Sequence, residues 1–509
     1  MTRHGSAPWR SARVAGLVVL AMAGPGCTLG PDFRPPPAAL PAAWHDRSAG
    51  TAAAVVLSDP DPAWWRLFGD PVLTGLMARA MADNLDVGQA LARIAQARAQ
   101  EQAQRAAGLP GLDASAGYTR AKLGEAGLFS VFGGGTGANG QAFPESGIGG
   151  LTQGTDLYQV GFDASWELDL FGQVRRGVEQ AGAQAQARIE NRRDALVTLQ
   201  GDVARTYLEL RAAQALLAVA QGETAARADL LALTQLRHRL GLADRTDVDQ
   251  ARDGLTRARA ALPPLVQQAE QAMNDLAVLT GQPPGALDAR LTTARPLPDD
   301  PVPLAIGLPA ALARRRPDIR AAEAGLHAAT AGIGVAVAQF YPDLTLTGQF
   351  GQRSLALSDV AEWGNSFYQL GPAISLPLFQ GGRLRANLRL ARAQAAEAAL
   401  AYRQAVLNAL RDMDDGLSAL HADRTRRQND DAAVATADDR LALAHVRWRD
   451  GLGDRRAVLD DQATLAAARQ DALRGRLQVL LDIVALYKAA GGGWQAAPDE
   501  GKGVALWDP

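Results

Sequence analysis

The sequence repeats one plan twice, and this duplication limits the folds that the chain can adopt. "NLDVGQALARIAQARAQEQAQRAAGLPGLDASAGY", from Asn84, aligns with "RPDIRAAEAGLHAATAGIGVAVAQFYPDLTLTGQF", from Arg316, at an offset of 232 residues. Further along, "LDLFGQVRRG" aligns with "LPLFQGGRLR" at an offset of 208, and "LGLADRTDV" with "DGLGDRRAV" at 210. The offset falls by 24 because the first copy has about 24 extra residues between Tyr118 and Asp156. They include "FGGGTGANGQAFPESGIGG", which predicts a long Gly-rich loop without a phosphate-binding pattern.

Each copy contains a long span without proline. There is none between Glu145 and Leu262, and none between Leu378 and Ala497. Both spans are rich in Ala, Arg, Gln and Leu, which favour continuous helix. The sequence therefore predicts a very long helix followed by another long helix in each copy.

The spacing of apolar residues indicates that these helices pack as coiled coils. In the second copy, apolar residues from Leu384 to Leu420 step by four and three, which is close to the 3.5-residue period of a coiled-coil seam. A helix from Gly382 to about Trp448 would be ~100 Å long at 1.5 Å per residue. A compact globule of this mass has no room for such a helix.

Alternating apolar and polar residues predict four strands, two in each copy. In the first copy, Tyr158, Val160 and Phe162 alternate with polar residues and glycine, which fits a strand with one apolar face. An ordinary sheet packed on helices would show the same alternation. Four strands are few, however, beside roughly 300 residues of predicted helix, and aromatic residues near the strand ends are typical of lipid-facing strands. Four strands cannot close a barrel, so a membrane-spanning sheet would need several chains.

The first 26 residues have the layout of a secretory signal peptide. Three arginines precede an apolar core from Val14 to Ala23, which is too short to span a bilayer as a helix. Cleavage before Cys27, the only cysteine, would place its thiol at the new N-terminus, where bacterial lipoproteins are acylated. We therefore expect a covalent lipid on Cys27. A buried cysteine is the alternative, and Gly24 and Pro25 make an atypical recognition site.

Composition excludes several classes of protein. Without residues 1–26 the chain keeps 49 basic and 54 acidic residues, a net charge of −5, which argues against nucleic acid as a partner. Six scattered histidines form no metal-ligand spacing, so we expect no metal site, no cofactor and no enzymatic activity. One cysteine leaves no disulfide. Beyond residue 26 no uninterrupted apolar run reaches 18 residues, so we expect no transmembrane helix.

Several segments, in order, resemble those of TolC-like outer-membrane efflux proteins. Within that family, the resemblance is to the OprM-like lipoproteins that serve resistance-nodulation-division pumps. It covers residues 27 to about 494 and is carried by "CTLGPDFRPP", "WWRLFGDPVLTGLMARAMADNLDV", "FDASWELDLFGQVRRGVEQA", "LADRTDVDQARDGLTRARAALPPLVQQAEQAMNDLAVLTGQPPG", "RRRPDIRAAE" and "SLPLFQGGRLRANL".

The resemblance implies a mainly α fold with a small β part. A duplicated helix-strand-strand-helix plan would give long coiled-coil helices that form a periplasmic α-barrel. Four strands per chain would contribute to a 12-stranded transmembrane β-barrel in a homotrimer. The protein would lie in the outer membrane, anchored to its lipid and extending into the periplasm. It would be the exit duct of a tripartite efflux pump, with a periplasmic adaptor protein and an inner-membrane resistance-nodulation-division pump as partners.

The repeat and the resemblance together predict six segments. They are a signal peptide at 1–26, a lipid-anchored segment at 27–70, a first repeat at 71–282, a linker at 283–311, a second repeat at 312–490 and a flexible tail at 491–509. The first repeat would hold strands at about 112–119 and 156–169 with an external loop at about 120–155, and the second would hold strands at about 344–352 and 366–379.

Short turns at Gly241 and Gly451 would lie at the periplasmic tip, where members of the family close the tunnel. The first of these turns is followed by Asp247 and Asp249, which we expect to be structural or to face the adaptor.

The resemblance also names candidates for the periplasmic aperture. Asp460 falls on the position of a family aspartate that lines the constriction, and Asp461 beside it is a further candidate. Because a ring of like charges repels itself, closure depends on nearby basic groups. Arg455 and Arg456 are candidates for the ionic links that hold the closed state.

Two alternatives stay open. A TolC-like duct for type I protein secretion would share the fold and differ in its partners, although the lipoprotein start and the proline-rich residues after it favour efflux. A periplasmic coiled-coil lipoprotein without a pore would explain the helices and leave the four strands unexplained.

Overall fold

The computed structural model describes residues 28–37, 40–41, 43–45, 55–122 and 154–497. They divide into two compact units. The strand unit comprises residues up to Arg34 and the ranges Arg98–Ala183 and His327–Ala396. The helical unit comprises Pro35–Ala97, Gln184–Leu326 and the residues from Glu397 on. The signal peptide, Cys27, most of the Gly-rich loop and the end of the tail lie outside the described residues.

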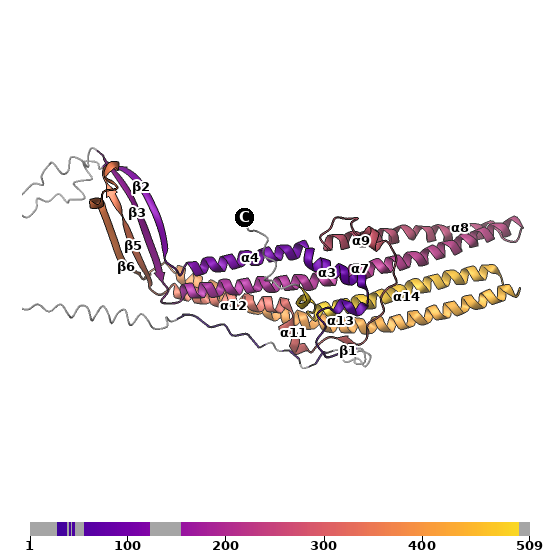
Figure 1. Cartoon of the computed structure of the whole chain (residues 1–509). Coiled ribbons are helices and arrows are strands. Elements are labelled where there is room, and N and C mark those ends of the chain that lie inside the picture. Colours follow the sequence, from indigo (N-terminus) through magenta and orange to yellow (C-terminus); the bar gives the residue numbers. More distant parts are fainter. Residues whose placement is uncertain (1–27, 38–39, 42, 46–54, 123–153, 498–509) are drawn as a thin grey trace, which may run out of the picture. The chain divides into compact units, whose positions relative to one another are not determined.

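The strand unit holds one four-stranded antiparallel sheet of order β2-β3-β5-β6 (Figure 1). Each repeat supplies one hairpin, and the two hairpins meet where β3 pairs with β5. The strands are β2 Gly111–Ala121, β3 Thr155–Leu168, β5 Asp343–Ser354 and β6 Ser366–Ser375. The last strand ends before the predicted residue 379, because its final residue, Ser375, already pairs with Asp343, the first residue of β5.

The register places apolar side chains on one face of this sheet. Phe162 lies opposite Phe350, which lies opposite Tyr368, so the three rings share one row across the sheet. These side chains are exposed, and Tyr368 and Leu370 on β6 keep 83% and 73% of their surface open. An ordinary two-layer sheet would bury this face against helices. The described residues leave it uncovered.

Four helices contribute residues to both units. They are α4 Leu85–Ala106, α7 Gln173–Arg239, α12 Pro317–Ala338 and α13 Arg383–Arg449. The two longest, α7 and α13, have 67 residues each and begin after the second strand of their repeat. At 1.5 Å per residue each is ~100 Å long. The mainly helical fold and the duplicated long helices predicted from the proline-free spans are confirmed.

The helical unit packs parts of these four helices and the remaining helices around one buried core. Its other main helices are α3 Pro71–Asp83, α8 Arg245–Ala260, α9 Leu262–Leu279, α11 Pro309–Arg315 and α14 Arg455–Ala489. In Figure 1, α8 runs beside α7 and α14 beside α13. Fully buried side chains of the core include Leu276, Met413 and Ile483, and Trp64 stacks on Tyr487 with ring centroids 5.3 Å apart.

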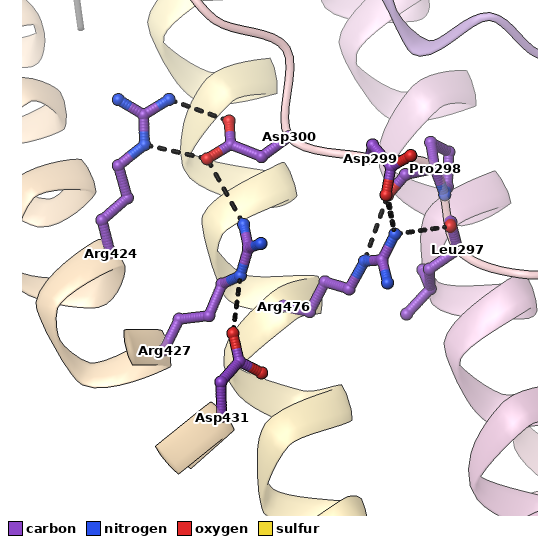
Figure 2. Close-up of polar contacts among 8 residues, drawn as sticks. All are labelled: Leu297, Pro298, Asp299, Asp300, Arg424, Arg427, Asp431 and Arg476. Carbon is purple, nitrogen blue, oxygen red and sulfur yellow. Dashed lines mark hydrogen bonds and ion pairs between the residues drawn. The ribbon is translucent and has the colours of Figure 1, made fainter. Parts of the chain in front are cut away.

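The linker between the repeats is tied to the second long hairpin (Figure 2). Asp300 accepts hydrogen bonds from Arg424 Nη2 at 2.8 Å and Nε at 3.0 Å, and it lies 3.4 Å from Arg427 Nη1. Arg476 of α14 donates to the carbonyl of Leu297 at 3.0 Å and to Asp299 at 2.6 Å. Arginines of α13 and α14 thus position a segment that is poor in regular structure.

One expectation needs correction. By length and composition alone, the described helix α12 is apolar enough to cross a membrane, although none was expected to be. Its Ala, Gly and Val residues give a high average, whereas His327 and Thr330 interrupt the apolar run. Two of its residues, Ile319 and Ala331, are fully buried, so it packs against protein. In the described part of the tail, the indole of Trp494 donates to the carbonyl of Arg315 at 3.1 Å.

Candidate functional site

The candidate site lies at the ends of the two long hairpins, α7–α8 and α13–α14, in the helical unit. Both turns are built alike. Gly241 and Gly451 adopt φ values of +71° and +70°, a conformation that favours glycine. The amide of Leu242 donates to the carbonyl of Arg237 at 2.8 Å, and the second turn makes the equivalent bond at the same length. These are Schellman closures, in which glycine ends one helix and reverses the chain.

Each turn is followed by an aspartate that starts the next helix. Asp244 caps α8 and accepts from the amide of Asp247 at 2.8 Å, in a reciprocal capping box. Asp454 caps α14 and accepts from the amide of Arg456 at 3.1 Å. A carboxylate at a helix N-terminus is stabilised by the free amides there. Both tips are therefore rigid turns between capped helices.

Two ion pairs connect the hairpins. Arg237 Nη1, at the end of α7, lies 2.6 Å from Asp454 Oδ2. In the opposite direction, Arg456 Nη1 of α14 lies 3.7 Å from Asp247 Oδ1 of α8. The backbone hydrogen bond from Arg456, with a further contribution from Arg237, lowers the pKa of Asp454. Asp454 therefore stays charged to lower pH than an ordinary aspartate.

Asp460 and Asp461 differ in their surroundings. The Asp460 side chain is 53% exposed and lies 3.8 Å from Arg456 Nε on its own helix. The Asp461 side chain is only 18% exposed and accepts a hydrogen bond from Arg440 Nη2 of α13 at 2.9 Å. Asp460 thus presents its charge to the surroundings, whereas Asp461 joins α14 to α13.

The two candidate arginines also differ. Arg456 lies near both Asp247 and Asp460. Arg455 lies over the ring of Trp448, 5.5 Å from its centroid, and makes no ion pair with a described carboxylate of its chain. Within one chain, only Arg456 of the two has the contacts of an ionic link.

Sequence reasoning missed three residues of this site, namely Arg237, Asp454 and Arg440. Asp454 carries a recognisable signal, because an aspartate after a turn glycine is a typical N-cap. The partner of each arginine has no signal in the sequence, since Arg237 pairs with a residue 217 positions away. Asp249, expected to be structural or to face the adaptor, pairs with Arg245 and Arg252 of its own helix.

Apolar side chains cover the outer surface of both turns. Leu240 and Leu242 at the first turn and Leu452 at the second are all exposed. A contiguous exposed apolar patch rimmed by polar residues is typical of a surface that binds another protein. Among the described residues, no group of three or more His, Cys, Asp or Glu side chains is placed to hold a metal.

The sheet presents a second exposed feature. Its outer strands, β2 and β6, each pair on one side only among the described residues. An open strand edge is a template for pairing with another chain. Together with the uncovered apolar face, these edges distinguish the sheet from one that is complete within a single chain.

The chain is similar to known proteins over most of its length. The family model described as outer membrane efflux protein matches residues 76–282 and 308–492, one range in each repeat. The toluene efflux pump outer membrane protein TtgF of Pseudomonas putida is 34% identical over 491 residues, which cover 94% of this chain and 96% of TtgF.

Two solved structures share the fold. The outer-membrane channel OprN is 31% identical, with a TM-score of 0.79 over 92% of this chain and 100% of that chain. The open state of the MtrE outer membrane channel of Neisseria gonorrhoeae is 28% identical, with a TM-score of 0.74 over 92% of this chain and 99% of that chain.

Proposed function

The chain belongs to the outer membrane efflux protein family, and on that premise we propose that it is the exit duct of a tripartite efflux pump. Small molecules would pass from the pump and the periplasm to the exterior without chemical change. The observation that carries this proposal is the sheet, whose apolar face is uncovered and whose two edges are open. A duct acts by position and needs no catalytic group.

The proposed assembly is a homotrimer with a 12-stranded barrel. A membrane-spanning sheet must leave no unpaired backbone edge in lipid. One chain supplies four strands with free edges at β2 and β6, so β6 of one copy would pair with β2 of the next. The helices α4, α7, α12 and α13 would continue from the barrel as a periplasmic cylinder.

The proposed partners are a periplasmic adaptor protein and an inner-membrane resistance-nodulation-division pump. Support comes from the exposed leucines at the turns of Gly241 and Gly451, which offer an apolar surface for the adaptor. The relative TtgF is named as part of a toluene efflux pump. This favours a pump over protein secretion, and the sheet argues against a coiled-coil lipoprotein without a pore.

The proposed aperture is the ring that three copies of the tips would form. Asp460 is the candidate for the lining charge, because its carboxylate is more exposed than that of Asp461. Arg456 is the candidate for the ionic link, and the pair of Arg237 and Asp454 would hold the two hairpins of each copy together. Arg455 would support the tip through its contact with Trp448, and Asp461 would do so through its ion pair with Arg440.

A covalent lipid on Cys27 would add an anchor to the membrane-spanning sheet. Thr28, the next residue, packs against Gly172 at the start of α7: a Cβ placed on Gly172 would lie 3.0 Å from the Cα of Thr28. Thr28, which follows the proposed lipidation site, thus packs within the strand unit.

Negative-stain electron microscopy of the detergent-purified protein tests the proposal. Hollow tubes with threefold symmetry, longer than ~100 Å as the helix rise requires, are the expected result. Thin solid rods or compact globules would show that the strands do not form a shared barrel, and the duct would then be rejected.

A further inference from the structure

A stripe of arginines follows the last strand of the sheet. Arg385, Arg389 and Arg392 lie in the first turns of α13 and are all exposed. Their spacing of four and three residues places them on one face of the helix. Leu384 and Ala391, on other faces of the same turns, are buried. No acidic residue occurs between Glu362 and Glu397, so the chain itself supplies no nearby opposite charge in sequence.

The stripe also lacks a counter-charge in space. None of its three arginines makes a hydrogen bond or an ion pair with a described residue. The side chain of Arg383, two residues before Arg385, donates only to Gln380, at 2.9 Å. Three unpaired positive charges in about 10 Å of helix repel one another. An anionic partner outside the chain would relieve this repulsion.

The first repeat is an internal comparison. Shifted by the 208 positions that separate Phe171 from Phe379, the stripe falls on Gly177, Ala181 and Gln184, which are all neutral. The stripe is therefore a feature of the second copy and not of the shared plan.

The two arginines at the start of α7 are already paired. Arg175 lies 3.2 Å from Asp169, and the buried Arg176 lies 2.7 Å from both Asp32 and Glu179. At the start of α7, carboxylates of the chain neutralise the positive charge. At the start of α13 no described carboxylate does so, and the uncompensated positive charge at this position is therefore confined to the second repeat.

The residues that precede the arginine stripe indicate what kind of environment surrounds it. Leu378 and Phe379 keep 88% and 89% of their surface open, between the end of β6 and the start of α13. If the sheet spans the outer membrane, as in the proposed function, this connection leaves the hydrocarbon where lipid phosphates lie. Apolar residues followed by unpaired arginines are typical of a membrane interface. The planar guanidinium matches the phosphate group through paired N–H donors.

We propose that Arg385, Arg389 and Arg392 bind the phosphate groups of anionic lipids in the periplasmic leaflet, while Leu378 and Phe379 insert among the acyl chains. This surface fixes the depth of the duct in the membrane. The inference rests on the proposed function, because it requires the sheet to lie in lipid.

The test uses the full-length protein in detergent, titrated with phosphatidylglycerol and in parallel with phosphatidylcholine, with bound lipid counted by native mass spectrometry. The wild type should prefer phosphatidylglycerol. In the triple variant Arg385→Gln, Arg389→Gln and Arg392→Gln, phosphatidylglycerol binding should weaken by on the order of 100-fold, since each arginine near a lipid surface contributes roughly fivefold. Phosphatidylcholine binding should change little.

A matched control removes the same charge elsewhere. Arg245→Gln, Arg252→Gln and Arg257→Gln change three exposed arginines of α8, and this variant should bind phosphatidylglycerol like the wild type. Equal affinity of the stripe variant and the wild type for phosphatidylglycerol would overturn the proposal.

Two other results would also overturn it, by assigning the stripe to a different role. Loss of the trimer with unchanged lipid preference would show that the arginines bind a neighbouring copy. A change in ion selectivity in bilayers of zwitterionic lipid, with unchanged lipid binding, would show that they line the channel.

Micrographs of the same preparations separate the two hypotheses. Hollow threefold tubes, together with lipid binding that does not depend on the arginines, would reject the lipid-binding role of the stripe and leave the duct in place. Absence of tubes would reject the duct, and the lipid surface would fall with it.

Discussion

Arg237 near the end of α7 lies 2.6 Å from Asp454, the N-cap residue of α14. The two residues belong to different repeats and are 217 positions apart. Arg456 makes the converse contact with Asp247. The two hairpins of one chain are thereby linked near their turns, at the end that we propose forms the periplasmic aperture.

Arg237→Ala should loosen the tip and increase the open fraction of the channel. Exposed ion pairs contribute about 0.2–1 kcal/mol, so we expect an increase of up to ~5-fold in open-state occupancy in planar bilayers. In the double variant Arg237→Ala and Asp454→Ala, the Asp454→Ala substitution should increase open-state occupancy by less than it does in the wild-type background. Arg245→Ala is the control, since Arg245 pairs only within α8. Additive effects of the two substitutions would show that the pair does not stabilise the closed state.

Asp460→Ala should reduce the cation selectivity of the channel, because it removes the more exposed carboxylate. Asp461→Ala removes the same charge from the adjacent position, where Arg440 already neutralises it, and should change selectivity less. Reversal potentials in a salt gradient compare the two variants. Wild-type conductance and selectivity in Asp460→Ala would remove this residue from the aperture.

Leu370→Lys should prevent accumulation of the trimer in the outer membrane. The Leu370 side chain lies on the apolar face, near the middle of β6, and a lysine at the centre of the bilayer costs about 2–4 kcal/mol. Gln369→Lys places the same charge on the opposite face and should be tolerated. Trimer yield from isolated outer membranes measures both variants. Equal yields would contradict the assignment of the lipid-facing side.

Asp482→Asn should stabilise the protein at pH 7.5. Asp482 is only 6% exposed, and burial, with the nearby Asp423 adding to it, raises its pKa to about 6, although Gln478 donates a hydrogen bond at 3.0 Å. Because the pKa of Asp482 is raised in the folded state, its charged form lowers the free energy of unfolding above pH ~6. This loss disappears as the pH falls toward ~4, where the carboxyl is protonated in both states. Wild-type thermal stability should therefore rise between pH 7 and pH 5.

The substitution should remove this pH dependence and increase the free energy of unfolding at pH 7.5 by up to about 2 kcal/mol. Thermal melts followed by circular dichroism at several pH values measure both effects. Asp471→Asn changes an exposed aspartate of the same helix and should have little effect. A lower melting temperature of Asp482→Asn at pH 7.5 would contradict the prediction.

Cys27→Ser should abolish fatty-acid labelling of the protein in cells, since the thiol is the acceptor of the first lipid. If the strands span the membrane, the unlabelled variant should still reach the outer membrane, because the barrel holds it there. Labelling of the variant at the wild-type level would refute acylation at this position. Loss of the variant from the membrane fraction would show that the lipid is the main anchor.

The sequence determined those parts of the fold that depend on local physics. The absence of proline let α13 run for 67 residues without interruption of its backbone hydrogen bonds, and the turn at Gly451 ended it. Glycine marked both tip turns, because a φ near +70° favours a residue without a side chain. The period-two alternation predicted the two faces of the sheet, which follow from the pleat of each strand.

Only the tertiary structure decided which charges meet. Asp460 and Asp461 are adjacent and chemically identical, and the packing of α14 on α13 gives one of them Arg440 and leaves the other exposed. Arg455 and Arg456 are also adjacent and identical, yet Arg455 lies over the ring of Trp448 whereas Arg456 pairs with Asp247. Ion-pair partners depend on helix rotation and register across hundreds of residues, and the pattern along a single helix does not encode them.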